Sequence, residues 1–236
     1  MAGNLTRKEL LKQDKFTVEA ENTWDWVSTH RKEVVRYGGI GLAVILLVAA
    51  VFYYRASQSS VREEILGEDM ALMNAPIGQP APNGGPSFAT QAARDDAAKK
   101  AFTKLASDYS GSEEAYVSEY YLGTISLDTG NVDDARKKYQ DVADHAGANY
   151  ASLAKLALAQ LDFAQNRMSE AETILKDLMD HPTDLVSKAQ ATFTYAKTLE
   201  PTKPDEARKL LSTLASQQGD IGQLATTEIS NLGQRQ

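Results

Sequence analysis

The chain has 236 residues, with 25 Lys and Arg, 32 Asp and Glu, and no cysteine, which excludes disulfides, thiol catalysis and cysteine-based metal sites. Residues 1–36 hold seven basic and six acidic side chains, whereas the part after residue 54 holds 18 basic and 26 acidic ones, a net charge of −8. That acidic balance argues against nucleic acid as a partner, since phosphate binding needs a basic face.

Residues 1–36 form a predicted leader, and its later part, "TWDWVSTHRKEVVR", places apolar residues roughly on one helical face. These residues are Trp24, Val27, Val34 and Val35. One interpretation is an amphipathic helix that lies on a membrane or contacts a partner. The other is a helix that only leads into the next segment, with its tryptophans at the membrane interface.

Residues 37–54, "YGGIGLAVILLVAAVFYY", contain no charge and lie between Arg36 and Arg55. A helix of this length is about 27 Å long, close to the roughly 30 Å of a bilayer's hydrocarbon core. The stretch lacks the polar stripe of a core helix, and it is longer and further from the N-terminus than a signal peptide's apolar region. We therefore expect a single transmembrane helix over 37–54.

Seven Lys and Arg residues precede the predicted span, whereas only Arg55 and Arg62 lie close behind it. The positive-inside bias then predicts a cytoplasmic N-terminus and a C-terminal part on the other side of the membrane. Gly39 and Ala43 form a small-xxx-small pair, so self-association of the span is a further hypothesis.

Residues 55–90 are expected to hold a helix and a loop. The segment "SSVREEILGEDMALM" has apolar residues at helical spacing, and "NAPIGQPAPNGGPS" (74–87) is rich in proline and glycine. After Phe88 the pattern is helical throughout, with no alternation that predicts a strand.

A period of 36 residues organises residues 91–236. The segments 132–143, 168–179 and 204–215 each carry an apolar stripe at i, i+4 and i+7 that begins with alanine. The stripes are Ala135, Tyr139 and Val142; Ala171, Leu175 and Leu178; and Ala207, Leu211 and Leu214.

A breaker and an earlier helix precede each stripe. The breakers are residues 129–131, 165–167 and 200–204, and the earlier helices are 113–128, 150–165 and 186–199. Ser169 with Glu172 fits a capping box, and Pro204 fits a first helical turn.

The sequence thus predicts helix–turn–helix units at about 113–148, 149–184 and 185–219. A partial unit with Ala98, Phe102 and Leu105 comes before them, and a cap helix over 221–233 follows. One such unit cannot bury its own stripe, so the units should stack into an all-α solenoid.

This part of the chain resembles tetratricopeptide repeats. The residues at the family's spacing are Leu122-Gly123, Gly130, Ala135 and Tyr139 in the first unit, Leu158-Ala159, Ala171, Leu175 and Pro182 in the second, and Ala207 and Leu211 in the third. Thr194-Tyr195 replaces the large–small pair in the third unit, and Glu119, Lys155 and Ala191 replace the family's tryptophan.

The whole layout is similar to YfgM-like ancillary subunits of the bacterial Sec translocon. The similarity covers the aromatic and basic approach to the span, "SLAKLALAQLDFAQNRMSEAETILKDL", and the closing "EISNLG". It implies a bacterial inner-membrane protein with a periplasmic repeat domain that works in a chaperone network. The expected partners are the translocon and secreted client proteins.

No residue pattern predicts catalysis. The three histidines, His30, His145 and His181, lie in separate segments, and the chain has no zinc-type histidine pair, phosphate loop or nucleophile motif. His145 and His181 fall near helix ends, where a histidine complements the helix dipole. We therefore expect no enzyme activity, metal, cofactor or small-molecule substrate.

The repeat resemblance implies that the first helix of each unit lines a concave, protein-binding face. The candidate residues are Val117, Tyr120, Thr124, Leu127, Leu153, Leu156, Gln160, Phe163, Ala189, Thr192, Ala196 and Leu199. Most are apolar or neutral, and no Lys/Arg pair could clamp a terminal carboxylate, so an apolar or extended polypeptide is the expected ligand. For Leu127 and Leu156, a place in the core is an equal alternative.

Two functions remain open at this stage. The chain is a tethered module that holds many client proteins, or it is a scaffold of envelope assembly or cell division with one fixed partner.

Overall fold

The computed structural model describes residues 31–81 and 84–234, and it divides into two compact units, one ending at Ser60 and the other beginning at Val61. The described residues form helices, with one isolated β-bridge between Ile77 and Phe88. The expected all-α class is therefore confirmed. Most of the predicted leader, residues 1–30, lies outside the described residues.

Helix α2 (Arg31–Met73) is continuous through the end of the predicted leader, the predicted span and the helix expected after it, which the sequence predicts as three separate segments. No proline occurs between its ends, so nothing removes a backbone hydrogen bond along it. Over the first unit its described apolar side chains are exposed, for example Tyr37 at 68% and Leu47 at 65%. Among the helices as far as they are described, none combines the length and the apolar character needed to cross a membrane, so the transmembrane helix over 37–54 is not confirmed.

The end of α2 belongs to the second unit and packs on the repeats. Leu66, Met70 and Met73 lie against the buried side chains of Phe102 and Ile125. The predicted loop follows and is closed at its base, because the Gly78 N–H donates to the Phe88 carbonyl at 2.8 Å and the Phe88 N–H donates to the Pro76 carbonyl at 3.0 Å.

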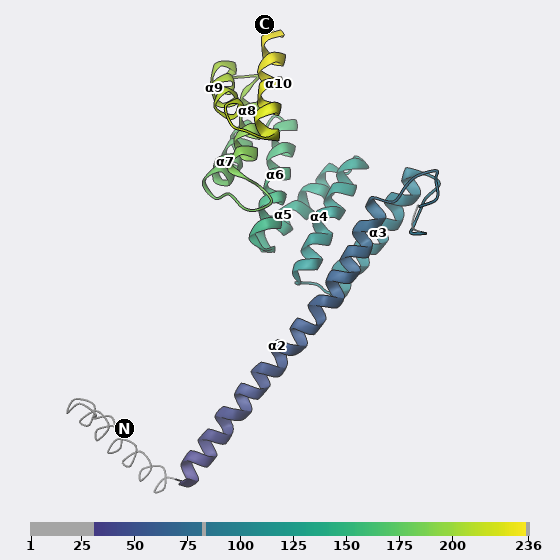
Figure 1. Ribbon diagram of the computed structural model, residues 1–236, viewed down its shortest axis with the longest axis vertical. Helices are drawn as coiled ribbons and strands as arrows, with labels where there is room; N and C mark the ends of the chain where they lie inside the picture. Colours follow the sequence, from purple (N-terminus) through teal and green to yellow (C-terminus); the bar gives the residue numbers. More distant parts are fainter. Residues whose placement is uncertain (1–30, 82–83, 235–236) are drawn as a thin grey trace, which may run out of the picture. The chain divides into compact units, whose positions relative to one another are not determined.

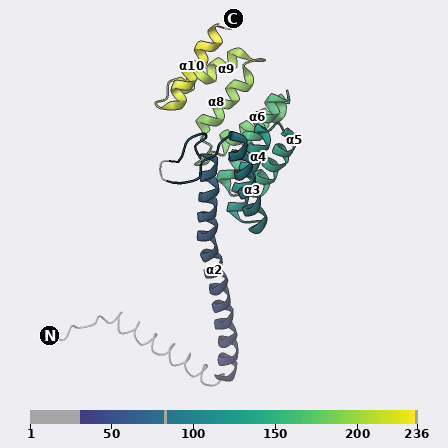
Figure 2. The same ribbon diagram turned by 90° about the vertical axis from the view of Figure 1, so that its right-hand side faces the viewer.

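The second unit continues as antiparallel hairpins that follow one another in chain order (Figures 1 and 2). Helix α3 (Gln91–Asp108) precedes three hairpins, and α10 (Asp220–Gln234) closes the series. The hairpins are α4 (Glu113–Asp128) with α5 (Val132–His145), α6 (Ala148–Ala164) with α7 (Met168–Asp180), and α8 (Lys188–Leu199) with α9 (Pro204–Ala215).

We call α4, α6 and α8 the inner helices, because α4 contacts α6 and α6 contacts α8 across the hairpin boundaries. The predicted solenoid of helical pairs is thereby confirmed. The cap helix is also confirmed, since Ala225 and Leu232 of α10 pack with Leu211 and Leu214.

The first two hairpin turns have the same backbone design. Gly130 and Asn166, which lie 36 residues apart, both have positive φ, 81° and 61°. The following residue in each turn donates its N–H back to the ending helix, Asn131 to Ser126 and Arg167 to Asp162, both at 2.7 Å. This left-handed closure satisfies helix-end carbonyls and needs glycine or asparagine at its centre.

The predicted capping box at Ser169 and Glu172 is wrong. Helix α7 begins at Met168 with Arg167 at its N-cap, and the Ser169 hydroxyl donates to Glu170 Oε2 at 2.8 Å. The left-handed turn at Asn166 starts the helix immediately, so Ser169 is already inside it. Pro204 occupies the first turn of α9, as expected.

The 36-residue stripes form the core. All nine stripe residues are buried, and Phe102 and Leu105 of the partial unit are also buried. The helices α5, α7 and α9 carry the same stripe because each packs its hairpin against the helix that follows it, α6, α8 or α10.

Candidate functional site

The inner helices carry all twelve residues of the predicted binding face, but not all of them reach the surface. Val117, Leu156, Ala196 and Leu199 are at most 6% exposed, so they contribute to packing and present no side chain to a partner. Leu127 and Gln160 are exposed. The half-buried members are Tyr120, Thr124, Leu153, Phe163, Ala189 and Thr192.

A group of tyrosines surrounds Tyr120 on the first hairpin and the start of the second. The Tyr120 ring centroid lies 5.6 Å from that of Tyr121, 5.5 Å from that of Tyr139 and 5.9 Å from that of Tyr150. We call these four residues the tyrosine surface. Ring pairs at such separations gain about 0.5–1.5 kcal/mol beyond area burial. This cluster therefore connects α4, α5 and α6 while leaving three of its rings partly open.

Sequence reasoning named only Tyr120 for binding and placed Tyr139 in the core stripe; it missed Tyr121 and Tyr150. The signal was present as three tyrosines within "YVSEYY" on one helix and a fourth at the start of the next inner helix. Only the packing of α6 on α4 shows that Tyr150 reaches Tyr120.

The hydroxyls of Tyr120, Tyr139 and Tyr150 stay protonated over the physiological range. Burial, reinforced by neighbouring tyrosines, raises the pKa of Tyr120 to about 12, and burial likewise raises that of Tyr150 to about 12. Burial also raises the pKa of Tyr139, whose hydroxyl bonds to Thr124 Oγ1 at 3.1 Å. The half-buried Tyr120 and Tyr150 thus offer neutral rings and neutral hydroxyls to a ligand.

In the first two hairpins, Glu119 and Lys155 stand where tetratricopeptide repeats have tryptophan, and each forms an ion pair. The Lys138 ammonium lies 2.8 Å from Glu119, and the Lys155 ammonium lies 2.7 Å from Asp177. Each pair joins the two helices of one hairpin. The first helix supplies the acid in the first hairpin and the base in the second. The ion pair thus links the two helices of each hairpin without an aromatic side chain at this position.

A buried carboxylate lies where the first hairpin meets the second. Asp162 of α6 is 4% exposed, and its Oδ1 lies 2.8 Å from Arg136 Nη2 of α5. The same oxygen accepts from Arg167 Nε at 2.9 Å. One acid is thus held by two guanidinium groups, one from α5 and one from the turn between α6 and α7, which fits a structural role.

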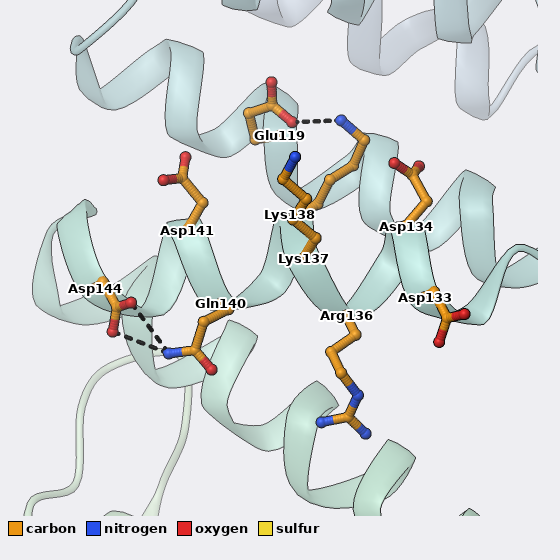
Figure 3. A pocket seen from close by; sticks show the side chains of 9 residues that line it. All are labelled: Glu119, Asp133, Asp134, Arg136, Lys137, Lys138, Gln140, Asp141 and Asp144. Atoms are coloured by element: carbon orange, nitrogen blue, oxygen red, sulfur yellow. Dashed lines mark hydrogen bonds and ion pairs between the residues drawn. The ribbon is translucent and has the colours of Figure 1, made fainter.

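A hollow of about 820 Å³ lies along α5, and Figure 3 shows its charged lining. Its side chains largely pair with one another or with neighbours: Glu119 with Lys138, Asp144 with Gln140, and Asp134 with Ser126. No chemical class of ligand follows from this mixture. The lining residues are Glu119, Asp133, Asp134, Arg136, Lys137, Lys138, Gln140, Asp141 and Asp144.

The two histidines in the repeats have equivalent surroundings. His145 Nδ1 lies 2.9 Å from the Asp141 carbonyl oxygen, and His181 Nδ1 lies 3.1 Å from the Asp177 carbonyl oxygen. Both sit at the ends of their helices, as the dipole interpretation predicts. Within the described parts of the chain, no group of histidine and acidic side chains could hold a metal ion.

Part of the chain matches the model of a known protein family. Residues 38–181, more than half of the chain, match the tetratricopeptide repeat-like domain. The chain belongs to this family. The tetratricopeptide repeat-like match ends at His181, before the third hairpin, where the sequence resemblance was confined to α9.

Neither the comparison with curated proteins nor the comparison with solved structures found a match. The resemblance to YfgM-like translocon subunits is therefore not confirmed by any homologue. Membership of the tetratricopeptide repeat-like family supports protein partners in general.

Proposed function

We propose that this chain is a non-catalytic, membrane-tethered module whose repeats bind polypeptide segments along the inner helices. The observation that carries this proposal is the tyrosine surface. Rings of Tyr120, Tyr121 and Tyr150 remain partly exposed across two consecutive inner helices. Aromatic groups with a polar tip are enriched at protein interfaces, because they combine a large contact area with hydrogen bonding.

One exposed and one half-buried apolar residue extend the same side toward the other end of the inner helices. Leu127 and Phe163 lie 36 residues apart, at equivalent positions of α4 and α6, and are exposed and half-buried, respectively. The equivalent residue of α8, Leu199, is 1% exposed. We therefore assign binding mainly to the first two hairpins.

The membrane tether is proposed from the sequence. Residues 37–54 form an uncharged stretch of bilayer length, and an apolar surface of this kind needs lipid or protein to cover it. We further propose the bacterial inner membrane, with the N-terminus in the cytoplasm and the repeats in the periplasm. In that setting, tethering beside a translocon would raise the local concentration of a weak binder.

Site-specific photo-crosslinking in cells tests the binding proposal. A photoreactive residue replaces Tyr120 or Phe163, and a matched control replaces Lys137, which is exposed on α5. We expect polypeptides captured from Tyr120 and Phe163, with much weaker capture from Lys137. Equal capture at all three positions, or background only, would overturn the proposal.

The captured proteins also separate the two modes of action. Many substoichiometric envelope or secreted proteins would support client holding, whereas one stoichiometric partner would support the scaffold alternative. Capture of translocon subunits, together with resistance of the chain to alkaline extraction from membranes, would support the proposed location. Loss of the chain to the soluble fraction would overturn the tether.

A further inference from the structure

The charges of helix α4, which carries Tyr120 and Tyr121 of the tyrosine surface, are all negative. Helix α4 holds four acids, Glu113, Glu114, Glu119 and Asp128, and no base. Glu114 pairs with Arg62 at 2.7 Å, and Glu119 pairs with Lys138 at 2.8 Å. Over the described residues, Glu113 and Asp128 have no basic partner within ion-pair distance.

These two acids lie at opposite ends of α4 and on the side that carries Tyr120. At about 100° per residue, positions 113, 120, 124 and 128 fall within roughly one quarter of the helix circumference. Both carboxylates reach the tyrosines electrostatically. Burial is the main cause of the raised pKa values of Tyr139 and Tyr150, and the charges of Asp128 and Glu113, respectively, add to them.

Tyrosine rings also hold cations elsewhere in this chain. The Arg62 guanidinium lies 5.9 Å from the Tyr109 ring centroid, and the Lys176 ammonium lies 5.3 Å from the Tyr195 ring centroid. A cation over a tyrosine face gains about 0.5–1 kcal/mol at exposed sites.

We infer that the tyrosine surface selects extended segments in which basic residues flank an apolar or aromatic stretch. This inference rests on the proposed function and specifies its ligand. The ends of α4 are about 22 Å apart at about 1.5 Å per residue. An extended chain covers that distance in about seven residues at about 3.3 Å each, so one base would meet Glu113 and the other Asp128.

Three nine-residue peptides test the selection on the full chain in an uncharged detergent, with fluorescence anisotropy as the readout. All share an apolar centre with two aromatic residues, and their flanks are lysine, glutamine or glutamate. We expect affinity in the order lysine, glutamine, glutamate. We also expect the advantage of the lysine peptide over the glutamine peptide to shrink as salt rises, because exposed charges are screened.

Variants of α4 test which acids cause the preference for the lysine peptide. Asp128→Asn should weaken the lysine peptide about two- to fivefold, the range of one exposed ion pair, and should weaken the glutamine peptide less. Glu113→Gln should do the same, although its amide replaces the carboxylate that accepts from the Gly147 N–H at 2.8 Å. Glu119→Gln is the matched control, since it removes the same charge from α4 at the ion pair with Lys138, and it should change neither affinity.

The outcomes distinguish this inference from the proposed function. If the glutamine or glutamate peptide binds as tightly as the lysine peptide, the charge selection is wrong while polypeptide binding stands. If none of the three binds and crosslinking also captures nothing, both proposals fail. Peptide-independent self-association that Glu113→Gln abolishes would identify a second copy as the occupant and overturn the inference.

Discussion

The junction between the first and second hairpins differs from the junction between the second and third. At the first junction, Arg136 reaches the buried Asp162, and Glu113 Oε2 accepts from the Gly147 N–H at 2.8 Å. At the second, an apolar cluster dominates, with Leu175, Val186 and Leu199 each at most 1% exposed.

The two junctions can be compared at equivalent repeat positions, which lie 36 residues apart. Position 162 corresponds to Thr198 in the third hairpin, which is buried but bonds only to the Tyr195 carbonyl of its own helix. Arg136 corresponds to Glu172, whose Oε1 lies 3.8 Å from the half-exposed Lys203. Both junctions contain a buried apolar cluster, and the first adds an ion pair to the buried Asp162. We call the first the charged junction and the second the apolar junction. One scaffold tolerates both, because stacking needs only a sealed interface between neighbours.

The largest expected effect is at the apolar junction. Leu175→Ala removes a fully buried side chain and leaves a cavity, so the free energy of unfolding should fall by about 3–4 kcal/mol. Chemical denaturation of the full chain followed by circular dichroism measures it. Thr173→Ala, on the exposed side of the same helix, should stay within about 0.5 kcal/mol of the unmodified chain.

At the charged junction, Asp162→Thr installs the residue found at the equivalent third position. It leaves Arg136 and Arg167 without their acid and should cost about 2 kcal/mol in the same denaturation experiment. The cost stays below that of fully buried pairs, because the arginine side chains are 29% and 39% exposed. A greater loss than for Leu175→Ala would reverse our ranking of the two junctions.

Within the first hairpin, the contact between the small Gly123 and the large Tyr139 provides a further test of packing. A Cβ on Gly123 would lie 2.8 Å from Tyr139 Cε1, so Gly123→Ala should destabilise the first hairpin by about 1–2 kcal/mol. The second hairpin has Ala159 and Leu175 at these positions. Adding Tyr139→Leu should therefore recover at least half of the loss in a double-mutant cycle. Additive effects would show that the two residues do not compete for space.

The smallest effect concerns Asp69, near the end of α2. Among the described residues, its buried Oδ2 has no hydrogen-bond partner, and burial, then the charge of Glu68, raise its pKa above the usual 3.8 while Lys104 opposes them. The protonated form is favoured by folding, so its stabilising contribution is complete below pH 3.8 and is lost as pH rises through the folded-state pKa.

Asp69→Asn should consequently raise the free energy of unfolding by about 1 kcal/mol at pH 7. The difference from the unmodified chain should disappear on acidification, which denaturation at several pH values measures. A variant that is less stable at neutral pH would show that the carboxylate has a partner in solution.

Most of the repeat architecture could be predicted, because one apolar stripe every 36 residues specifies both the helices and their partners. Helix α4 has the bounds that the sequence suggested, and Pro204 starts α9 as expected. The start of α7 could not be predicted from Ser169, because the turn conformation at Asn166 decides where that helix begins.

The candidate surface was predicted less well. Position along the repeat places all twelve candidates on the inner helices, but it does not separate exposed Leu127 from buried Leu199, which occupies the same position two repeats later. That difference depends on what the next helix places over each residue. The contact of Tyr150 with Tyr120 depends on inter-hairpin packing in the same way.

Cysteine labelling tests most directly whether partners bind along the inner helices, since the chain has no cysteine of its own. Gln160→Cys reports on the inner helix α6 and Lys137→Cys on α5, the second helix of the first hairpin, and both native residues are exposed. With a captured partner or the lysine-flanked peptide bound, maleimide modification should slow at position 160 and remain unchanged at position 137. Protection of position 137 with free modification at 160 would contradict the account.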